Sequence, residues 1–169
     1  ARQDLRRVLI VCPASLRNKW QNEMAQRFGE RFDILNAADV RRRLASQNEK
    51  DLLYQKLYGI VSYETIRCKS CRDILTDYPP SLDFIIADEI HHCRNRETHN
   101  FRTTRILTEN SDSVVFLSAT PVHTGNKNLF NLMNLLLPER FDLEEAFLRQ
   151  LDANKHVVRA ETMICQGTD

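Results

Sequence analysis

Two acidic residues, Asp88 and Glu89, directly follow the apolar run Phe84-Ile85-Ile86-Ala87. Two carboxylates at the end of a buried segment are costly unless a positive group compensates their charge. A hydrated Mg²⁺ can do so, with one carboxylate holding the ion through water while its neighbour polarises an attacking water. A simpler interpretation is that both acids start a helix, where the helix dipole favours negative charge. The pair alone therefore indicates either a metal-assisted hydrolytic site or a helix terminus.

Hydroxyl-bearing residues follow three other apolar runs. The runs and their polar clusters are Val8–Cys12 with Pro13–Ser15, Ile60–Tyr63 with Thr65, and Val114–Leu117 with Ser118–Thr120. Hydroxyl groups in such places can bind phosphate oxygens without distinguishing one nucleic-acid sequence from another. They also serve as turn residues before a proline or as helix N-caps, and Ser15 is expected to be able to cap the helix that follows it, so each cluster alone is a weak signal.

The elements that position these clusters follow from the pattern of the apolar runs. The runs are short and continuous, which is typical of strands buried on both faces of a parallel sheet. Helical patterns lie between them, and we expect helices over 15–28, about 38–58, a stretch that includes 101–107, 126–137 and 143–151. The sequence therefore predicts an α/β fold in which all four clusters lie at the carboxyl ends of the strands.

Composition narrows the class of protein. The chain has 169 residues, 42% hydrophobic and 28% charged, with a formal net charge of +1, which fits one globular domain. No apolar run approaches the ~20 residues needed to span a bilayer. The five cysteines form an odd count without a secretory signal, which favours reduced thiols in an intracellular compartment, the cytoplasm or nucleoid if the source is prokaryotic.

The clusters together resemble a known set of motifs. Asp88-Glu89-Ile90-His91 resembles the DEAH-type Walker B box of superfamily-two helicases and translocases, and Ser118-Ala119-Thr120 resembles their coupling motif. The segments Val8–Trp20 and Ile60–Thr65 resemble the two that line the nucleic-acid track. The likeness is strongest to Swi/Snf-type DNA-dependent ATPases, because a Leu-rich stretch ending in Pro138-Glu139-Arg140-Phe141 follows. Four motifs in this order form a strong combined signal.

The resemblance implies roles for individual residues. Asp88 would coordinate Mg²⁺ through water, Glu89 would orient and deprotonate the attacking water, and His91 would link the nucleotide site to the hydroxyls of Ser118 and Thr120. The expected nucleic-acid contacts are Ser15, Leu16, Arg17, Lys19, Tyr63 and Thr65. Two positions depart from the family pattern, since Ile90 replaces a small Ala and Arg94 replaces a common Lys.

One part of such a motor is missing from the sequence. A phosphate-binding loop needs Gly-x-x-x-x-Gly-Lys-Ser/Thr, and no lysine directly follows any of the four glycines. The resemblance therefore implies residues 1–159 of a partial first RecA-like lobe, with helices on both faces of a parallel sheet that lacks its phosphate-loop strand. We expect a fraying tail at 160–169, an exposed sheet edge prone to self-association, and negligible hydrolysis by the chain alone.

The same resemblance implies the partners of the parent protein. They are ATP and Mg²⁺ as cofactors, nucleic acid with double-stranded DNA favoured, and a second RecA-like lobe of the same parent chain. No membrane partner is expected.

Other interpretations remain open. Cys68 and Cys71 form a C-x-x-C pair that, with downstream His and Cys residues, could bind zinc or act as a thioredoxin-like redox pair. Cys93 beside His92 could be a nucleophile, although no oxyanion-hole signal accompanies it. The chain could also be a non-catalytic module that binds nucleic acid or a protein.

Overall fold

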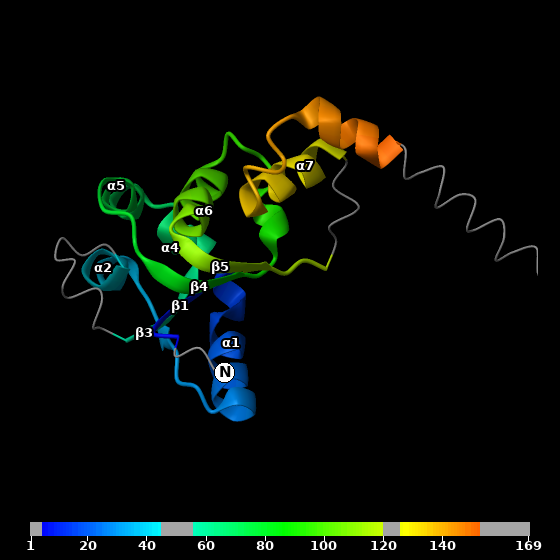
Figure 1. The fold of residues 1–169 in the computed structure, drawn as a ribbon. Helices are drawn as coiled ribbons and strands as arrows, with labels where there is room; N and C mark the ends of the chain where they lie inside the picture. Colours follow the sequence, from blue (N-terminus) through cyan, green and yellow to red (C-terminus); the bar gives the residue numbers. More distant parts are fainter. Residues whose placement is uncertain (1–4, 45–55, 120–125, 153–169) are drawn as a thin grey trace, which may run out of the picture.

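The computed structural model describes residues 5–44, 56–119 and 126–152, and these form one parallel sheet with helices on both faces (Figure 1). The sheet order is β2-β3-β1-β4-β5, and every neighbouring pair is parallel. The strands are β1 (Arg7–Cys12), β2 (Asp33–Ile34), β3 (Leu57–Ser62), β4 (Leu82–Ala87) and β5 (Ser111–Phe116). The predicted α/β class and parallel sheet are confirmed.

Strand β1 lies at the centre of the sheet because its sequence is apolar on both faces. All six of its residues are buried. Leu9 and Val11 belong to the apolar cluster on one face, whereas Val8 and Ile10 belong to the cluster on the other. A strand that alternates between two apolar layers needs no polar side, which explains the continuous run in the sequence.

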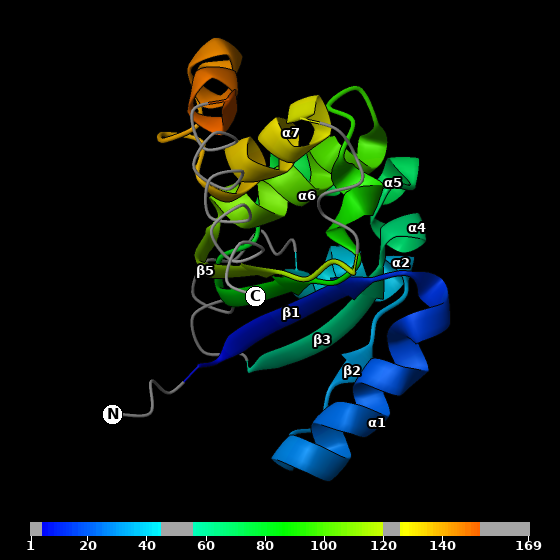
Figure 2. The same cartoon turned by 90° about the vertical axis from the view of Figure 1, so that its right-hand side faces the viewer.

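The helices divide unequally between the two faces. Among the described helices, α1 (Arg17–Phe28) is the one that covers the first face, and the others lie opposite it, as Figure 1 and the perpendicular view in Figure 2 both show. The opposite face carries α2 (Ala37–Asp39), α4 (Tyr63–Ile66), α5 (Lys69–Asp77), α6 (His99–Glu109) and α7 (Asn126–Leu136). Residues 144–152 are also helical, close to the predicted span of 143–151.

One expectation about secondary structure is wrong, and one strand was missed. The predicted helix over 38–58 does not extend that far, because Leu57 and Tyr58 belong to β3, where they pair with Arg7 and Val8 of β1. The helical part that is described covers 37–44, and residues 45–55 lie outside the described residues. The edge strand β2 was not predicted, because two residues are too few to form a pattern. The tail at 160–169 also lies outside the described residues.

Side chains approach the backbone of β3 closely at Gly59, where β3 packs beside β1. A Cβ added at Gly59 would lie 2.7 Å from Leu35 Cδ1 and 3.4 Å from Leu9 Cδ1. Both neighbours are fully buried. A glycine at this position therefore lets Leu35 pack directly against the strand backbone.

In the part of the chain that the structure describes, the α1 face of the sheet is covered by helix at β1 and left bare towards β5. In the register of the sheet, Ile10 of β1 pairs with Ile86 of β4, and Ile86 pairs with Val115 of β5. Ile10 is fully buried, Ile86 is half-buried, and Val115 is 38% exposed. Leu117, two residues beyond Val115, is equally exposed. Burial on this face therefore falls steadily from β1 towards the free edge of β5.

Candidate functional site

The polar clusters gather at one edge of the sheet, as parallel strands require. The strands β1, β3, β4 and β5 end at Cys12, Ser62, Ala87 and Phe116. The segments that follow, Pro13–Ser15, Tyr63–Thr65, Asp88–His92 and Leu117–Ser118, all leave the sheet at these carboxyl ends. Thr120, the last residue of the expected coupling motif, lies outside the described residues.

Asp88 is the most firmly held of the predicted site residues. Its backbone N–H donates to the carbonyl of Val11 at 2.8 Å, which extends the pairing of β4 with β1 by one residue. The indole N–H of Trp20 donates to Asp88 Oδ2 at 2.8 Å, and the backbone N–H of Glu89 donates to Oδ1 at 2.9 Å. The Tyr63 hydroxyl donates to the Asp88 carbonyl oxygen at 2.9 Å. Both the carboxylate and the backbone of Asp88 are therefore fixed.

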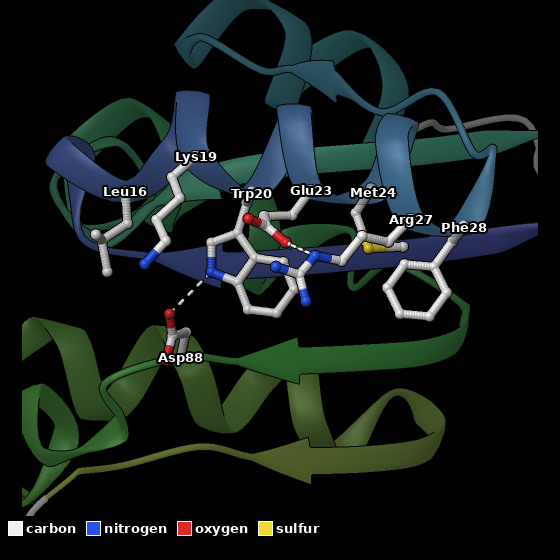
Figure 3. A pocket seen from close by; sticks show the side chains of 8 residues that line it. All are labelled: Leu16, Lys19, Trp20, Glu23, Met24, Arg27, Phe28 and Asp88. Atoms are coloured by element: carbon white, nitrogen blue, oxygen red, sulfur yellow. Dashed lines mark hydrogen bonds and ion pairs between the residues drawn. The ribbon is translucent and has the colours of Figure 1, made fainter.

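An open pocket of about 410 Å³ lies between α1 and Asp88 (Figure 3). Trp20 and Lys19 both extend from α1 towards the Asp88 carboxylate. The full lining is Leu16, Lys19, Trp20, Glu23, Met24, Arg27, Phe28 and Asp88. Asp88, at the end of β4, is the one lining residue outside α1 and the turn before it. The pocket therefore lies between α1 and the end of β4.

Glu89 is held in a strained backbone conformation. Its φ is 51°, and it is the one non-glycine residue with positive φ among the described residues. Residues other than Gly, Asn and Asp rarely adopt this left-handed region. Its side-chain atom Oε2 lies 3.1 Å from His91 Nδ1. This is an ion-pair distance, but the geometry is not that of a hydrogen bond. Both atoms, Glu89 Oε2 and His91 Nδ1, are buried, and neither makes a hydrogen bond to any described residue.

The loop after Glu89 is joined to the end of β5 through the backbone. The Leu117 N–H donates to the Ala87 carbonyl at 2.9 Å, and the Ile90 N–H donates to the Leu117 carbonyl at 3.0 Å. Ile90 is buried in the main apolar cluster, which explains how the larger side chain is accommodated where Ala is common. Ser118 follows Leu117 directly and is half-buried. The two predicted motifs therefore meet at Ile90 and Leu117.

Tyr63 lies beneath the site and not on its surface. Its side chain is 2% exposed, and its ring lies 5.7 Å from the ring of His92. Burial, followed by the nearby Cys93 and Asp88, raises the pKa of Tyr63, so the hydroxyl remains a proton donor to Asp88. Burial and the neighbouring His91 lower the pKa of His92, which favours its neutral form. In this arrangement Tyr63 supports Asp88.

The residues expected to begin the nucleic-acid track lie on a short turn and the helix that follows it. Ser15 is exposed in a 3₁₀ turn over Ala14–Leu16, and α1 begins only at Arg17. The expectation that Ser15 caps the helix is wrong, because the N-cap positions of the two helical segments are occupied by Pro13 and Leu16. Neither residue makes a side-chain capping hydrogen bond.

The donors of this turn are partly used within it. The Leu16 N–H donates to the Pro13 carbonyl at 2.9 Å, and Arg17 Nε donates to the Ala14 carbonyl at 3.1 Å. Lys19 is exposed beside the pocket. In α4, the Thr65 N–H and hydroxyl both contact the Ser62 hydroxyl, at 3.2 Å and 3.0 Å. Ser15 and Lys19 therefore present the most accessible polar groups of the predicted track.

The cysteines do not form a metal centre in the part of the chain that the structure describes. Cys12, Cys68, Cys71 and Cys93 are free thiols, and no group of three or more His, Cys, Asp or Glu side chains there could hold a metal ion. Cys93 is fully buried against Thr104, and burial raises its pKa to about 12. A buried, protonated thiol is a poor nucleophile. Within the described ranges, no helix is long and apolar enough to cross a membrane.

Two contacts at the site were missed from the sequence. Trp20 was placed within the segment Val8–Trp20 that resembles the nucleic-acid track, and Tyr63 was assigned to that track, yet both donate to Asp88. Each carries one polar atom on a largely apolar ring, which buried aromatic residues usually satisfy with a hydrogen bond. From the sequence one could therefore expect that each ring makes a hydrogen bond, but not which residue accepts it.

Comparison with known proteins gives a consistent assignment. Residues 2–165 match the family model described as SNF2-related domain. The chain is 31% identical over 165 residues to the RNA polymerase-associated protein RapA of Vibrio atlanticus (strain LGP32), covering 95% of this chain and 17% of that protein. The chain therefore spans a small part of this relative.

Two solved structures share the fold. The Sulfolobus solfataricus SWI2/SNF2 ATPase core in complex with dsDNA has a TM-score of 0.60 at 19% identity. The core domain from the same organism has a TM-score of 0.58 at 20% identity. Each match covers 85% of this chain and 27% of the other. The sheet is thus the RecA-like sheet of such a core, and the chain belongs to the SNF2-related domain family.

Proposed function

We propose that the chain is part of the first lobe of a DNA-dependent ATPase motor and supplies its Walker B and coupling motifs. The observation that supports this most directly is the fixed carboxylate of Asp88. Hydrogen bonds from Trp20 and Glu89 orient both of its oxygens at the carboxyl ends of parallel strands. Such strand ends are where α/β sheets bind ligands. A simple helix-terminal role does not need two such contacts from separate elements.

The donor set at this edge fits Mg²⁺. Carboxylate oxygens are the ligands that hard divalent cations prefer. Asp88 would hold Mg²⁺ through water, and when bound the ion would offset the negative charge of nucleotide phosphates. Glu89 Oε2 lies 3.1 Å from His91 Nδ1 and makes no hydrogen bond to the described residues, so this carboxylate is not tied into the fold as the Asp88 carboxylate is. Both features favour a hydrolytic site over a structural turn.

Glu89 and His91 would act together on the attacking water. The Glu89 carboxylate would accept a proton from water, and its side chain is held on a left-handed backbone directly after Asp88. His91 lies 3.1 Å from that carboxylate and keeps it oriented. The backbone link from Ile90 to Leu117 would carry movements of this loop to Ser118 and on to Thr120. We assign Tyr63 to the support of Asp88 in place of a direct contact with nucleic acid.

Double-stranded DNA is the proposed partner of the exposed turn. The solved structure with TM-score 0.60 is of a core in complex with dsDNA. Ser15, Arg17 and Lys19 would contact the phosphate backbone, with the Leu16 and Thr65 segments positioning them. Contacts of this kind give affinity that is independent of base sequence and sensitive to salt.

The bare side of the α1 face supports a missing phosphate-loop strand. The crossovers from β1 through α1 and from β4 through α6 run in opposite directions along the sheet, so right-handed connections place these helices on opposite faces. Suppose that a further strand lay beyond β5 and was followed in the chain by β1. The connection between them would cross the sheet in the same direction as the one through α1, so its helix would lie on the α1 face, over β4 and β5. Val115 and Leu117 are the exposed apolar residues there, and Ile86 is half-buried.

The chain alone is therefore expected to hydrolyse ATP negligibly. It has no phosphate loop among its four glycines, and a second lobe would have to supply the arginine that accelerates such reactions by ~10³–10⁵. A coupled-enzyme ATPase assay with double-stranded DNA tests this. Turnover that rises clearly on adding DNA would contradict the proposal that half of the nucleotide site is absent.

The catalytic assignment is tested in a longer version of the protein that carries a phosphate loop and a second lobe. Glu89→Gln should reduce DNA-stimulated ATPase activity by at least about 10²-fold, because it removes the proton acceptor, while binding of double-stranded DNA is retained. The matched control is Glu97→Gln, an exposed position on the same loop, which should leave activity unchanged. Absence of ATPase activity in the unsubstituted longer protein would favour a non-catalytic binding module.

The DNA contact is tested on the chain itself by fluorescence anisotropy with a labelled duplex. Lys19→Gln should weaken binding about two- to tenfold for every duplex sequence and reduce the salt dependence. Lys69→Gln, an exposed lysine on the opposite face of the sheet, is the control. Equal losses for the two variants would show that binding follows net charge and not this turn.

A further inference from the structure

A pair of cysteines at the start of α5 has no part in the proposed hydrolysis. Cys68 is the N-cap residue of α5, and Cys71 lies in its first turn. The Cys68 side chain makes no capping hydrogen bond, so its sulfur is not used to hold the helix. The backbone N–H of Cys71 donates to the Cys68 carbonyl at 3.1 Å, which fixes the turn between them.

The turn brings the two thiols to one side of the helix. Residues three apart in a helical turn are neighbours on one face, and a disulfide spans Cα atoms ~4.4–6.8 Å apart, so a bridge fits this turn. The backbone contact from Cys71 to Cys68 holds the two residues in this arrangement. Formation of a bond between the sulfurs would therefore need a change of side-chain rotamer and no movement of the sheet.

The two thiols differ in exposure and in chemical environment. Cys68 is half-exposed, whereas Cys71 is fully buried with its thiol 3.8 Å from the Ala37 carbonyl. The Ser70 hydroxyl lies 3.5 Å from the Cys68 sulfur, and Arg41 donates to that hydroxyl at 3.2 Å. An accessible sulfur near a cation and a protected sulfur behind it make an attacking thiol and a resolving thiol.

The acidities of the two thiols agree with this geometry. Burial acts to raise the pKa of Cys68, but hydrogen bonds from Ser70 and Cys71, together with the charge of Arg41, outweigh it and lower the pKa. Burial, followed by the neighbouring Cys68, raises the pKa of Cys71 to about 12. Cys68 is therefore the thiol that ionises first.

We propose that Cys68 and Cys71 form a reversible disulfide in response to hydrogen peroxide, with Cys68 as the peroxide-reactive thiol and Cys71 as the resolving thiol. In the first step the Cys68 thiolate attacks one peroxide oxygen. A sulfur–oxygen bond forms, the oxygen–oxygen bond breaks, and hydroxide leaves with the electron pair and takes up a proton. In the second step the Cys71 sulfur attacks the Cys68 sulfur, the sulfur–oxygen bond breaks, and water leaves with the Cys71 proton.

The net change is balanced. Two thiols lose two electrons and two protons in all, and one peroxide molecule becomes two molecules of water. The bridge would close directly after α4, since the Cys68 N–H donates to the Thr65 carbonyl at 3.3 Å. The proposal stands on the α5 geometry alone and does not depend on the proposed ATPase function.

The test is peptide mapping by mass spectrometry of the full chain with Cys165→Ser, after peroxide treatment in the presence of a metal chelator and then alkylation. The expected product is a Cys68–Cys71 peptide lighter by two hydrogen atoms, which dithiothreitol restores. Before oxidation, Cys68 should react with iodoacetamide at least about tenfold faster than buried Cys93. Absence of the bridge, or equal reactivity of Cys68 and Cys93, would overturn the proposal.

Two variants separate the roles of the thiols. In Cys71→Ala, Cys68 should stop at the sulfenic acid and become labelled by dimedone, because no resolving thiol is present. In Cys68→Ala, Cys71 should remain a thiol under the same treatment. Oxidation of Cys71 in the absence of Cys68 would reverse the assignment and contradict the proposal. Because the bridge itself is mapped without substitution at either cysteine, poor folding of a variant does not weaken the test.

Discussion

Strands β1 and β5 have the same length and lie in the same sheet, but they are buried very differently. Every residue of β1 is buried between two apolar layers. No residue of β5 is fully buried, and Val115 is 38% exposed. On the opposite face, Val114 and Phe116 still pack against the main cluster. The exposed apolar side chain of β5, Val115, therefore lies on the face that α1 covers elsewhere.

This difference shows that sequence pattern and burial measure separate things. Val114-Val115-Phe116-Leu117 is as apolar as the run in β1, and the sequence alone predicts both as strands buried on both faces. An apolar strand left half-covered at a free edge is a surface that other elements or molecules tend to cover. The contrast supports the proposal that a further strand and helix belong beside β5.

The largest expected effect comes from making the same substitution in each of the two strands. Val11→Ala should lower the free energy of unfolding by about 2–3 kcal/mol, because it removes two fully buried methyl groups and leaves a cavity. Val115→Ala should cost less than about 1 kcal/mol. Urea unfolding followed by the fluorescence of Trp20, the one tryptophan in the sequence, measures both. Equal losses would remove the contrast between the strands.

A second test uses crowding in place of cavities. Gly59→Ala should destabilise the protein by about 1–2 kcal/mol, because the new Cβ would meet the Leu35 side chain at 2.7 Å and force it to shift. The control is Ser113→Ala in β5, which is exposed and should change stability by less than about 0.5 kcal/mol. Unfolding by urea is again the measurement. A neutral Gly59→Ala would show that Leu35 adjusts freely.

The third test lies at the border between the covered and bare parts of the α1 face. Trp20→Phe should cost about 1 kcal/mol, since it removes the hydrogen bond to Asp88 and keeps most of the ring. In an Asp88→Asn background the same substitution should cost less, because the bond is weaker once its charged acceptor is gone. Circular dichroism during urea unfolding gives the four free energies. Identical costs in both backgrounds would mean that the contact contributes no coupling.

The smallest effect on stability is expected at Val115 itself. Val115→Lys should leave the free energy of unfolding within about 0.5 kcal/mol, because the side chain is largely exposed. It should nevertheless reduce self-association through the edge of β5, since a lysine on an edge strand opposes pairing. Light scattering over a range of concentrations compares the two proteins. If the unsubstituted chain remains monomeric throughout, the edge is not an adhesive surface.

The sequence predicted features that depend on local pattern and missed those that depend on the assembled fold. The strands at 8–12, 84–87 and 114–117 were found because continuous apolar runs are a direct sign of double burial. The helix assigned to 38–58 failed because apolar residues from a helix and from the following strand were merged into one pattern. The two-residue strand β2 gave no pattern to detect.

The candidate site shows the same division. Its place at the strand ends followed from topology, so Asp88, Glu89 and Ser118 were located correctly along the edge. The donation from Trp20 to Asp88 joins residues 68 positions apart, and no local rule specifies such a pair. Ser15 was expected to cap a helix because Ser is a good N-cap, but the chain forms a 3₁₀ turn there first.

The positive φ of Glu89 has a consequence for how this protein can change over generations. A left-handed backbone costs a glutamate about 1–2 kcal/mol relative to glycine, so Glu89→Gly should make the domain more stable. Variants selected only for folded yield would therefore tend to lose this carboxylate, whereas variants selected for hydrolysis would keep it. Glycine at position 89 in a related sequence would mark a chain released from catalysis and retained for its fold.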